Sequence, residues 1–363
     1  MYEEIQLNVP LLKRRVPNLT SAAKAVGLRA ATVSNLCTGR IPIGRAEVRT
    51  LVTLASLAGC TLDELIIRGG GAGMIETGIK CLDLFAPLVR GGTIGLVARP
   101  NMGQLVLLQE LMRRLKQQEV ASVFWTPKQT VTGVEDVCGE AEAVCRTLQE
   151  TVQAVSRLRA DRDVLLGADR EVVLSGEWFE LREQLQEAGA RHVTLVLVDT
   201  RGEAVDEESP YGPLDTLWRF DMGLIAQGFY PAIDPVSSAS VLSEGAYLDT
   251  AHLSIQHRAR KLLRRYRELR ALVQARSNTK GQAQAPDPEK FSLPEAEAAV
   301  YRTGERLEAF LTQPFYVAET FTGRAGEWVP LSDTLEGVRR ILDGAVDQVE
   351  PARLTYSGRL TLS

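Results

Sequence analysis

The chain has 363 residues, of which 45% are hydrophobic and 24% are charged, and its formal net charge is −4. These values are typical of a globular protein of two or three domains. The acidic start does not resemble a signal peptide, and no run reaches the roughly 18 apolar residues of a membrane span, so we expect a cytoplasmic protein without membrane association.

Residues 1–68 have a charge opposite to that of the rest of the chain. They contain nine basic and five acidic residues, which gives +4 for this stretch and −8 for the remainder. A basic module on an acidic body favours a polyanion as partner.

Short helices are predicted inside this module. Residues 21–26 form an alanine-rich helix, Gly27 supplies a tight turn, and a second helix covers residues 29–37. A longer apolar-periodic helix follows at 45–57, and Thr61 can cap a last short one. A helix, a glycine turn and a second helix form the unit that lays its second helix in the major groove of DNA.

The stretches SAAKAVGLRAATVSNLCTGR and LVTLASLAGCTLDELI resemble the Cro and XRE-like helix-turn-helix family over all of its helices. The resemblance implies an N-terminal all-α DNA-binding domain at residues 1–68. By that resemblance the residues that face base edges are Arg29, Ala30, Ala31, Ser34 and Asn35, and the phosphate contacts are Thr32, Arg40, Arg45 and Arg49. The alternative is a helical protein–protein module with a solvated basic face.

A glycine hinge at 69–74 leads to a stretch with the layout of a phosphate-binding loop. A β run at 93–97 meets a loop, which opens an apolar-periodic helix at 103–118. The motif requires G-x-x-x-x-G-K-[ST], whereas this chain has Ala98 and Gly103 followed by Gln104 and Leu105. The lysine and the hydroxyl are therefore missing, and the loop is interpreted as degenerate.

Strand-like runs alternate with helical segments through the larger part of the chain. Strands are predicted at 93–97, 121–125, 171–174 and 193–198, and helices at 103–118, 134–159, 177–188 and 252–276. This alternation predicts an α/β fold with a doubly wound parallel sheet. The last of these helices carries eight Arg and Lys residues after His257 against one acid, which leaves open a second DNA contact, a solvated face or a subunit interface.

Three stretches resemble the catalytic β subunit of rotary ATP synthase, in that family's order. They are ETGIKCLDLFAPLVRGGTIGL (76–96), GFYPAIDPVSSASVL (228–242) and FLTQPFYVAETFTGRAGEWVPLSDTLEGVRRILDGAVD (310–347). The resemblance implies a RecA-like nucleotide-binding core at 75–245, followed by a C-terminal helical domain at 246–363. The family's N-terminal β-barrel is absent, and the helix-turn-helix module stands in its place.

The resemblance also implies which site residues have changed. The family's phosphate-binding lysine and magnesium-binding threonine correspond to Gln104 and Leu105, and Lys128 stands near the position of the catalytic glutamate. Asp169 and Asp199 are both candidates for the family's metal-binding aspartate. We therefore predict no catalytic residue, no metal and no cofactor.

Aromatic residues match those that pack on adenine in the family, namely Tyr230, Phe315 and Phe321. Stacking needs only π-faces and apolar walls, so weak adenine-nucleotide binding stays open. The alternative is that these aromatics are ordinary core residues.

These observations predict a DNA-binding protein, either a transcriptional regulator or a nucleoid-associated factor. Its partners are double-stranded DNA and further copies of itself, as a dimer or a hexameric ring, and its body is a scaffold without ATPase chemistry. One alternative is a regulator that senses an adenine nucleotide without hydrolysing it. Another is an active ATPase, which Gln104, Leu105 and Lys128 oppose.

Overall fold

The computed structural model describes residues 6–16, 18–38, 40–67, 73–159, 162–187, 193–207, 210–244, 247–279 and 293–360. The chain forms two compact units, Met1–Gly73 with Val241–Tyr247, and Met74–Ser240 with Leu248–Ser363. Most of the glycine hinge expected at 69–74 lies outside the described residues.

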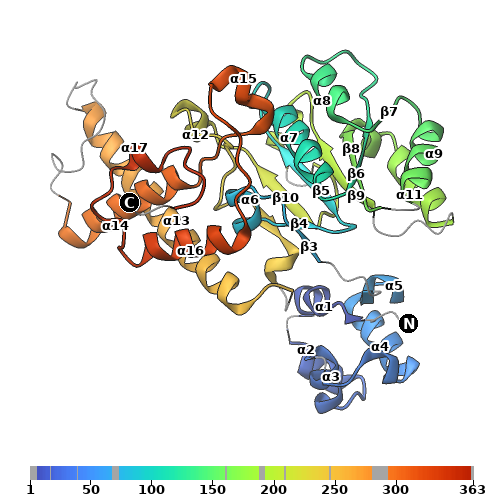
Figure 1. Ribbon diagram of the computed structural model, residues 1–363. Helices are drawn as coiled ribbons and strands as arrows, with labels where there is room; N and C mark the ends of the chain where they lie inside the picture. The colour runs from blue at the N-terminus through green and yellow to red at the C-terminus, as the bar shows by residue number, and fades with distance from the viewer. Residues whose placement is uncertain are drawn as a thin grey trace. The chain divides into compact units, whose positions relative to one another are not determined.

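The smaller unit consists of short helices and one pair of two-residue strands (Figure 1). Its elements are β1 Gln6–Leu7, α1 Val9–Arg15, α2 Leu19–Ala25, α3 Ala30–Cys37, the 3₁₀ turn η1 Ile43–Arg45, α4 Val48–Ala58, α5 Leu62–Leu65 and β2 Ile66–Ile67. Strands β1 and β2 pair antiparallel. The helices expected at 21–26, 29–37 and 45–57 are confirmed to within three residues, whereas α1 and the strand pair were not predicted.

Apolar side chains at helical spacing hold the smaller unit together. In α4 the buried positions include Leu51, Leu54, Ala55 and Ala58, which recur at intervals of three and four and so share one face. This face joins a cluster that includes Val33 of α3. Since each helix is too short to be stable alone, its stability comes from this packing.

The larger unit is built on a mostly parallel sheet, which confirms the predicted α/β class. Among the described residues seven strands run in the order β11-β10-β5-β9-β8-β6-β7, and only β11 is antiparallel to its neighbour. They are β5 Thr93–Val97, β6 Ala121–Trp125, β7 Ala143–Cys145, β8 Val164–Asp169, β9 Val193–Val198, β10 Thr216–Arg219 and β11 Ala239–Ser240.

Helices cover both faces of this sheet. Successive strand residues point to opposite faces, so that Val196 joins one core cluster and Leu197 the other. Helix α7 (Gln104–Lys116) packs on the first cluster through residues such as Leu111, and helices α9 (Leu148–Leu158) and α11 (Glu177–Glu187) pack on the second. Smaller helices are α6 Lys80–Phe85, α8 Val134–Glu140, α10 Glu171–Leu174 and α12 Met222–Ala226, and β3 Met74–Ile75 pairs with β4 Leu88–Val89.

Two predicted elements of this unit were wrong. The expected strand at 171–174 is helix α10, because the preceding apolar run Val164–Asp169 already forms the strand, and Asp169 accepts a hydrogen bond from Glu171 N. The single helix expected at 134–159 is interrupted by β7, which pairs with β6. Thr147 then caps a new helix by accepting from Glu150 N.

The C-terminal part consists of helices, all of which except α15 contribute to or pack against the first core cluster of the sheet. They are α13 Thr250–Thr279, α14 Glu295–Phe310, the 3₁₀ turn η5 Tyr316–Ala318, α15 Glu319–Thr322, α16 Leu331–Leu342 and α17 Pro351–Leu354. The backbones of α13 and α14 approach closely at Gly304, where an added Cβ would lie 2.4 Å from Tyr266. Beside this contact the rings of Tyr266 and Tyr301 meet edge to face at 5.2 Å.

Candidate nucleic-acid interface and degenerate phosphate loop

The exposed side of α3 carries small and polar side chains. Val33 and Leu36 are buried, which turns the opposite side of the helix outward. The expected base-reading residues Ala31 and Ser34 are exposed, as is Arg29 at the N-cap, while Ala30, Thr32 and Asn35 are half-buried. Ala31 and Ser34 thus face outward from α3, whereas Ala30, Thr32 and Asn35 flank its buried side.

A glycine turn fixes the angle between α2 and α3. Gly27 has φ +84°, a left-handed conformation that side chains disfavour. Leu28 N donates to the carbonyl of Ala23 at 2.9 Å, which closes the turn. Ala23 and Val33 are both buried in the same cluster, so the turn and the core fix α3 together.

The arginines predicted as phosphate contacts are free to meet an anion. Arg40, Arg45 and Arg49 are exposed. Within the described ranges none of them forms a side-chain hydrogen bond or an ion pair, and the same holds for Arg29. Arg15 differs, because its guanidinium donates to the carbonyl of Gly59 at 2.7 Å and so satisfies the C-terminal end of α4.

The loop between β5 and α7 is occupied by its own side chains. Arg99 N donates to the sulfur of Met102 at 3.1 Å, and Met102 is only 4% exposed. Pro100 packs on Gly202, where an added Cβ would lie 2.4 Å from the proline ring. A thioether therefore holds one of the backbone donors that a phosphate-binding loop would offer to its ligand.

The predicted degenerate positions lie in and beside this loop. Ala98 and Gln104 are buried, Leu105 is half-buried, and Gly103 at the N-cap of α7 has φ +88°. None of these residues offers a cation or a hydroxyl. Lys128, which was expected near the position of a catalytic glutamate, is exposed and pairs with Glu177 at 3.0 Å.

Both candidate aspartates accept hydrogen bonds from backbone N–H groups of residues that follow β8 and β9. Asp169, at the end of β8, accepts from Glu171 N at 2.8 Å and Thr200 N at 3.1 Å. Asp199, which follows β9, accepts from Arg201 N at 3.1 Å and also from Ala204 N. No group of three or more His, Cys, Asp or Glu residues that could hold a metal ion occurs in the described part of the chain.

Of the three candidate adenine-pocket aromatics, the structure brings two together. Tyr230 and Phe315 meet edge to face at 4.9 Å, and the Tyr230 hydroxyl donates to the carbonyl of Gly103 at 2.7 Å. Phe315 is 2% exposed, so neither face of its ring is open to a ligand. Phe321 is 89% exposed and lies outside this contact.

Several basic residues of α13 are engaged inside the unit. Arg260 donates to the carbonyls of Pro235 and Phe85, Arg267 pairs with Asp234 at 2.5 Å, and Arg270 pairs with Glu308 at 2.5 Å. These contacts remove three of the eight basic side chains from any second DNA contact on this helix.

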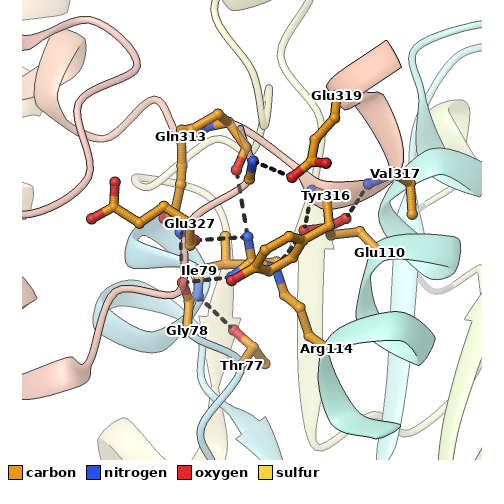
Figure 2. Close-up of polar contacts among 12 residues, drawn as sticks. Thr77, Gly78, Ile79, Glu110, Arg114, Gln313, Tyr316, Val317, Glu319 and Glu327 are labelled. Atoms are coloured by element: carbon orange, nitrogen blue, oxygen red, sulfur yellow. Dashed lines mark hydrogen bonds and ion pairs between the residues drawn. The ribbon is translucent and has the colours of Figure 1, made fainter. Parts of the chain in front are cut away.

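Sequence reasoning missed a buried polar network centred on Arg114 of α7 (Figure 2). Arg114 and Glu110 are both fully buried and pair at 2.5 Å. Arg114 also donates to the carbonyls of Gly78 at 2.9 Å and Glu327 at 3.0 Å, and Gln313 donates to the same two carbonyls. The spacing of Glu110 and Arg114, four residues apart on a predicted helix, was the only signal in the sequence.

Glu110 also orders the C-terminal segment. Its carboxylate accepts from Tyr316 N at 3.1 Å and Val317 N at 3.0 Å, at the start of η5 (Figure 2). The network therefore joins α7, the turn before α6 and residues 313–327, three stretches that are far apart in the sequence.

A buried lysine lies next to this network. Lys80 donates to the carbonyls of Ser357 at 2.5 Å and Gly358 at 3.3 Å, and its ammonium lies 4.1 Å above the ring of Phe310. Burial lowers the pKa of Lys80 to about 7, against a smaller opposing effect of Glu327. The role of this lysine is therefore to fasten the segment around Ser357.

A scan against protein-family models finds no match for this chain. The larger unit is an α/β unit in which the Met102 sulfur occupies a backbone donor of the loop between β5 and α7. The smaller unit is helical and has exposed arginines. No helix in the described ranges is long and apolar enough to cross a membrane.

Proposed function

We propose that the protein binds double-stranded DNA through α3 and the arginines around it. The observation that carries this proposal is the group of exposed arginines without acidic partners in the described residues, beside a helix face of small and polar side chains. Exposed arginines that form no ion pair with a carboxylate are suited to phosphates.

The roles of individual residues follow from base chemistry. Arg29 can pair with guanine, Asn35 with adenine, and Ala30 and Ala31 can contact a thymine methyl group. Arg40, Arg45 and Arg49, with Thr32, then hold the backbone and set affinity. The turn at Gly27 supports a helix-turn-helix reading, in which α3 enters the major groove. Such a protein acts as a transcriptional regulator or a nucleoid-associated factor in the cytoplasm.

We infer that the larger unit is a RecA-like relative of the ATP synthase β subunit without ATPase chemistry. Strand β9 lies between β5, which leads into the loop, and β8, which ends at Asp169, and this order suits a RecA-like core. Gln104 and Leu105 stand where a lysine and a hydroxyl are needed, and Met102 holds a loop donor. A bound triphosphate would have neither counter-charge nor metal ligand.

The remaining role for this unit is self-assembly, as a dimer or a ring. Large apolar side chains are exposed on it, with Phe321 at 89%, Phe179 at 62% and Leu174 at 58%. Assembly multiplies weak DNA-binding modules by raising their effective concentration. The RecA-like unit thus supports the DNA function as a scaffold.

Duplex binding measured by fluorescence anisotropy from 50 to 300 mM salt tests the proposal, with mass photometry on the same samples. We expect affinity to fall steeply with salt. Replacing Arg29 and Asn35 by Ala should reduce the preference between sequences, whereas Arg45→Ala should weaken all sequences alike. Unchanged anisotropy at 50 mM salt would exclude DNA as the partner, and a monomer with and without DNA would exclude the scaffold.

A further inference from the structure

Helix α4 presents an exposed face of unusual composition. Val48 is 71% exposed and Val52 is 45% exposed, and they share this side of the helix with Arg49 and Ser56, both also exposed. Arg49 is the only charged residue among the eleven of α4. The solvent face of a helix is ordinarily polar, so two outward valines, with the N-cap residue Glu47 as the one acid beside them, indicate a contact surface.

In the sequence, this face of α4 follows directly after the residues of the proposed DNA interface. The segment from α3 to α4 carries Arg40 and Arg45, both exposed, and Ile41 N donates to the carbonyl of Asn35 at 3.2 Å. This hydrogen bond folds the segment back onto the last turn of α3. Glu47 is the only acidic residue between positions 18 and 60, so positive charge dominates the approach to α4.

The chemistry of the face fits the DNA backbone better than a protein. The sugar–phosphate backbone alternates anionic phosphates with the largely apolar faces of deoxyribose, and α4 offers arginine beside valine. The helix is about 16 Å long and about 10 Å wide, so this face covers on the order of 160 Å². A stable dimer buries about 800 Å² on each partner, which is far more than this face supplies.

We propose that Val48 and Val52 pack on deoxyribose groups of the DNA backbone while Arg45 and Arg49 contact the adjacent phosphates. This assignment rests on the proposed DNA binding and adds an apolar, salt-independent part to it. Arginine contacts release counterions from DNA, and a valine–sugar contact releases none. The two kinds of contact are therefore distinguished by the salt dependence of binding.

The test compares the Val48→Gln, Val52→Gln double variant with Arg49→Gln and with Val26→Gln. Val26 is 47% exposed in the same unit but outside the α4 face, so it is the matched control. Duplex affinity is measured at several salt concentrations for two unrelated sequences, with mass photometry in parallel and thermal melting to check folding. The double variant should bind both sequences about tenfold more weakly with an unchanged salt slope. Arg49→Gln should lower that slope by about one, and Val26→Gln should behave like the wild type.

The other outcomes overturn the assignment. Wild-type affinity in the double variant would show that the valines touch only solvent. A loss of affinity together with a lower assembly mass would show that α4 pairs with a second copy of the chain. If the wild type itself binds no duplex at low salt, the proposed DNA binding fails and the valine assignment fails with it. The wild-type measurement alone gives that result, so it is distinguished from a failure of the valine contacts only.

Discussion

Replacing Arg114 by Met should strongly destabilise the larger unit. The variant leaves the fully buried carboxylate of Glu110 with two backbone N–H donors and no counter-charge. Breaking one partner of a buried ion pair costs about 3 to 5 kcal/mol. With a urea m-value of about 3 kcal/mol/M, the unfolding midpoint should fall by roughly 1 to 1.7 M.

The adjacent residue supplies a matched control. Arg113 lies on the same helix and pairs with Glu140 at 2.9 Å, but its side chain is 45% exposed. Arg113→Met should therefore cost less than about 1 kcal/mol. All four tryptophans, at 125, 178, 218 and 328, belong to the larger unit, so their fluorescence follows the unfolding of that unit alone.

A double variant separates charge from hydrogen bonding. Glu110→Gln together with Arg114→Met removes both charges and keeps an acceptor for Tyr316 N, so it should recover at least half of the loss. A loss of stability in Arg114→Met no larger than that in Arg113→Met would show that the buried Glu110 carboxylate does not depend on Arg114. No recovery in the double variant would assign the loss to the carbonyl contacts at Gly78 and Glu327 instead.

Two further predictions use the same fluorescence assay. The pKa of Lys80 is about 7 in the folded protein and 10.5 when the side chain is solvated, so the unfolded chain binds more protons between these two pH values. The free energy of unfolding should therefore rise with pH across that window. Lys80→Met should remove this rise, and a pH profile unchanged in the variant would show that the lysine is solvated. Gly103→Ala should cost about 1 to 3 kcal/mol, because φ is +88° and the new Cβ would lie 2.9 Å from Tyr230. Gly139→Ala in α8, with no atom within 4 Å, should be neutral or stabilising by up to about 1 kcal/mol, and equal effects at the two glycines would contradict this interpretation.

Local patterns predicted those elements whose signal lies within one stretch. Strands β5, β6 and β9 are continuous apolar runs between turn residues, and each was predicted within its bounds. Helix α10 was mistaken for a strand because its two valines carry a β preference, whereas its conformation is set by Asp169 and the strand before it. Helix α1 was missed because, unlike the equally short α2, it is neither alanine-rich nor followed by a glycine turn.

The site was predictable only where one residue type decides the chemistry. The identities of Gln104 and Leu105 alone show that these positions carry neither a phosphate-binding lysine nor a magnesium-binding hydroxyl. The Met102 sulfur contact depends on the path of the loop, and the Glu110–Tyr316 bond joins residues 206 positions apart. Neither contact leaves a periodic or local trace in the sequence, so both required the folded structure.

The contact between Arg99 N and Met102 opposes phosphate binding independently of the residues at positions 104 and 105. Placing Lys and Thr at these two positions would supply a cation and a hydroxyl, yet the loop would still hold a buried thioether against its own backbone donor. Moving that side chain out would expose an apolar group and leave a space in the core cluster to which Met102 belongs. A phosphate-binding loop could therefore be built at this position only by several simultaneous changes, in the loop side chain as well as at positions 104 and 105.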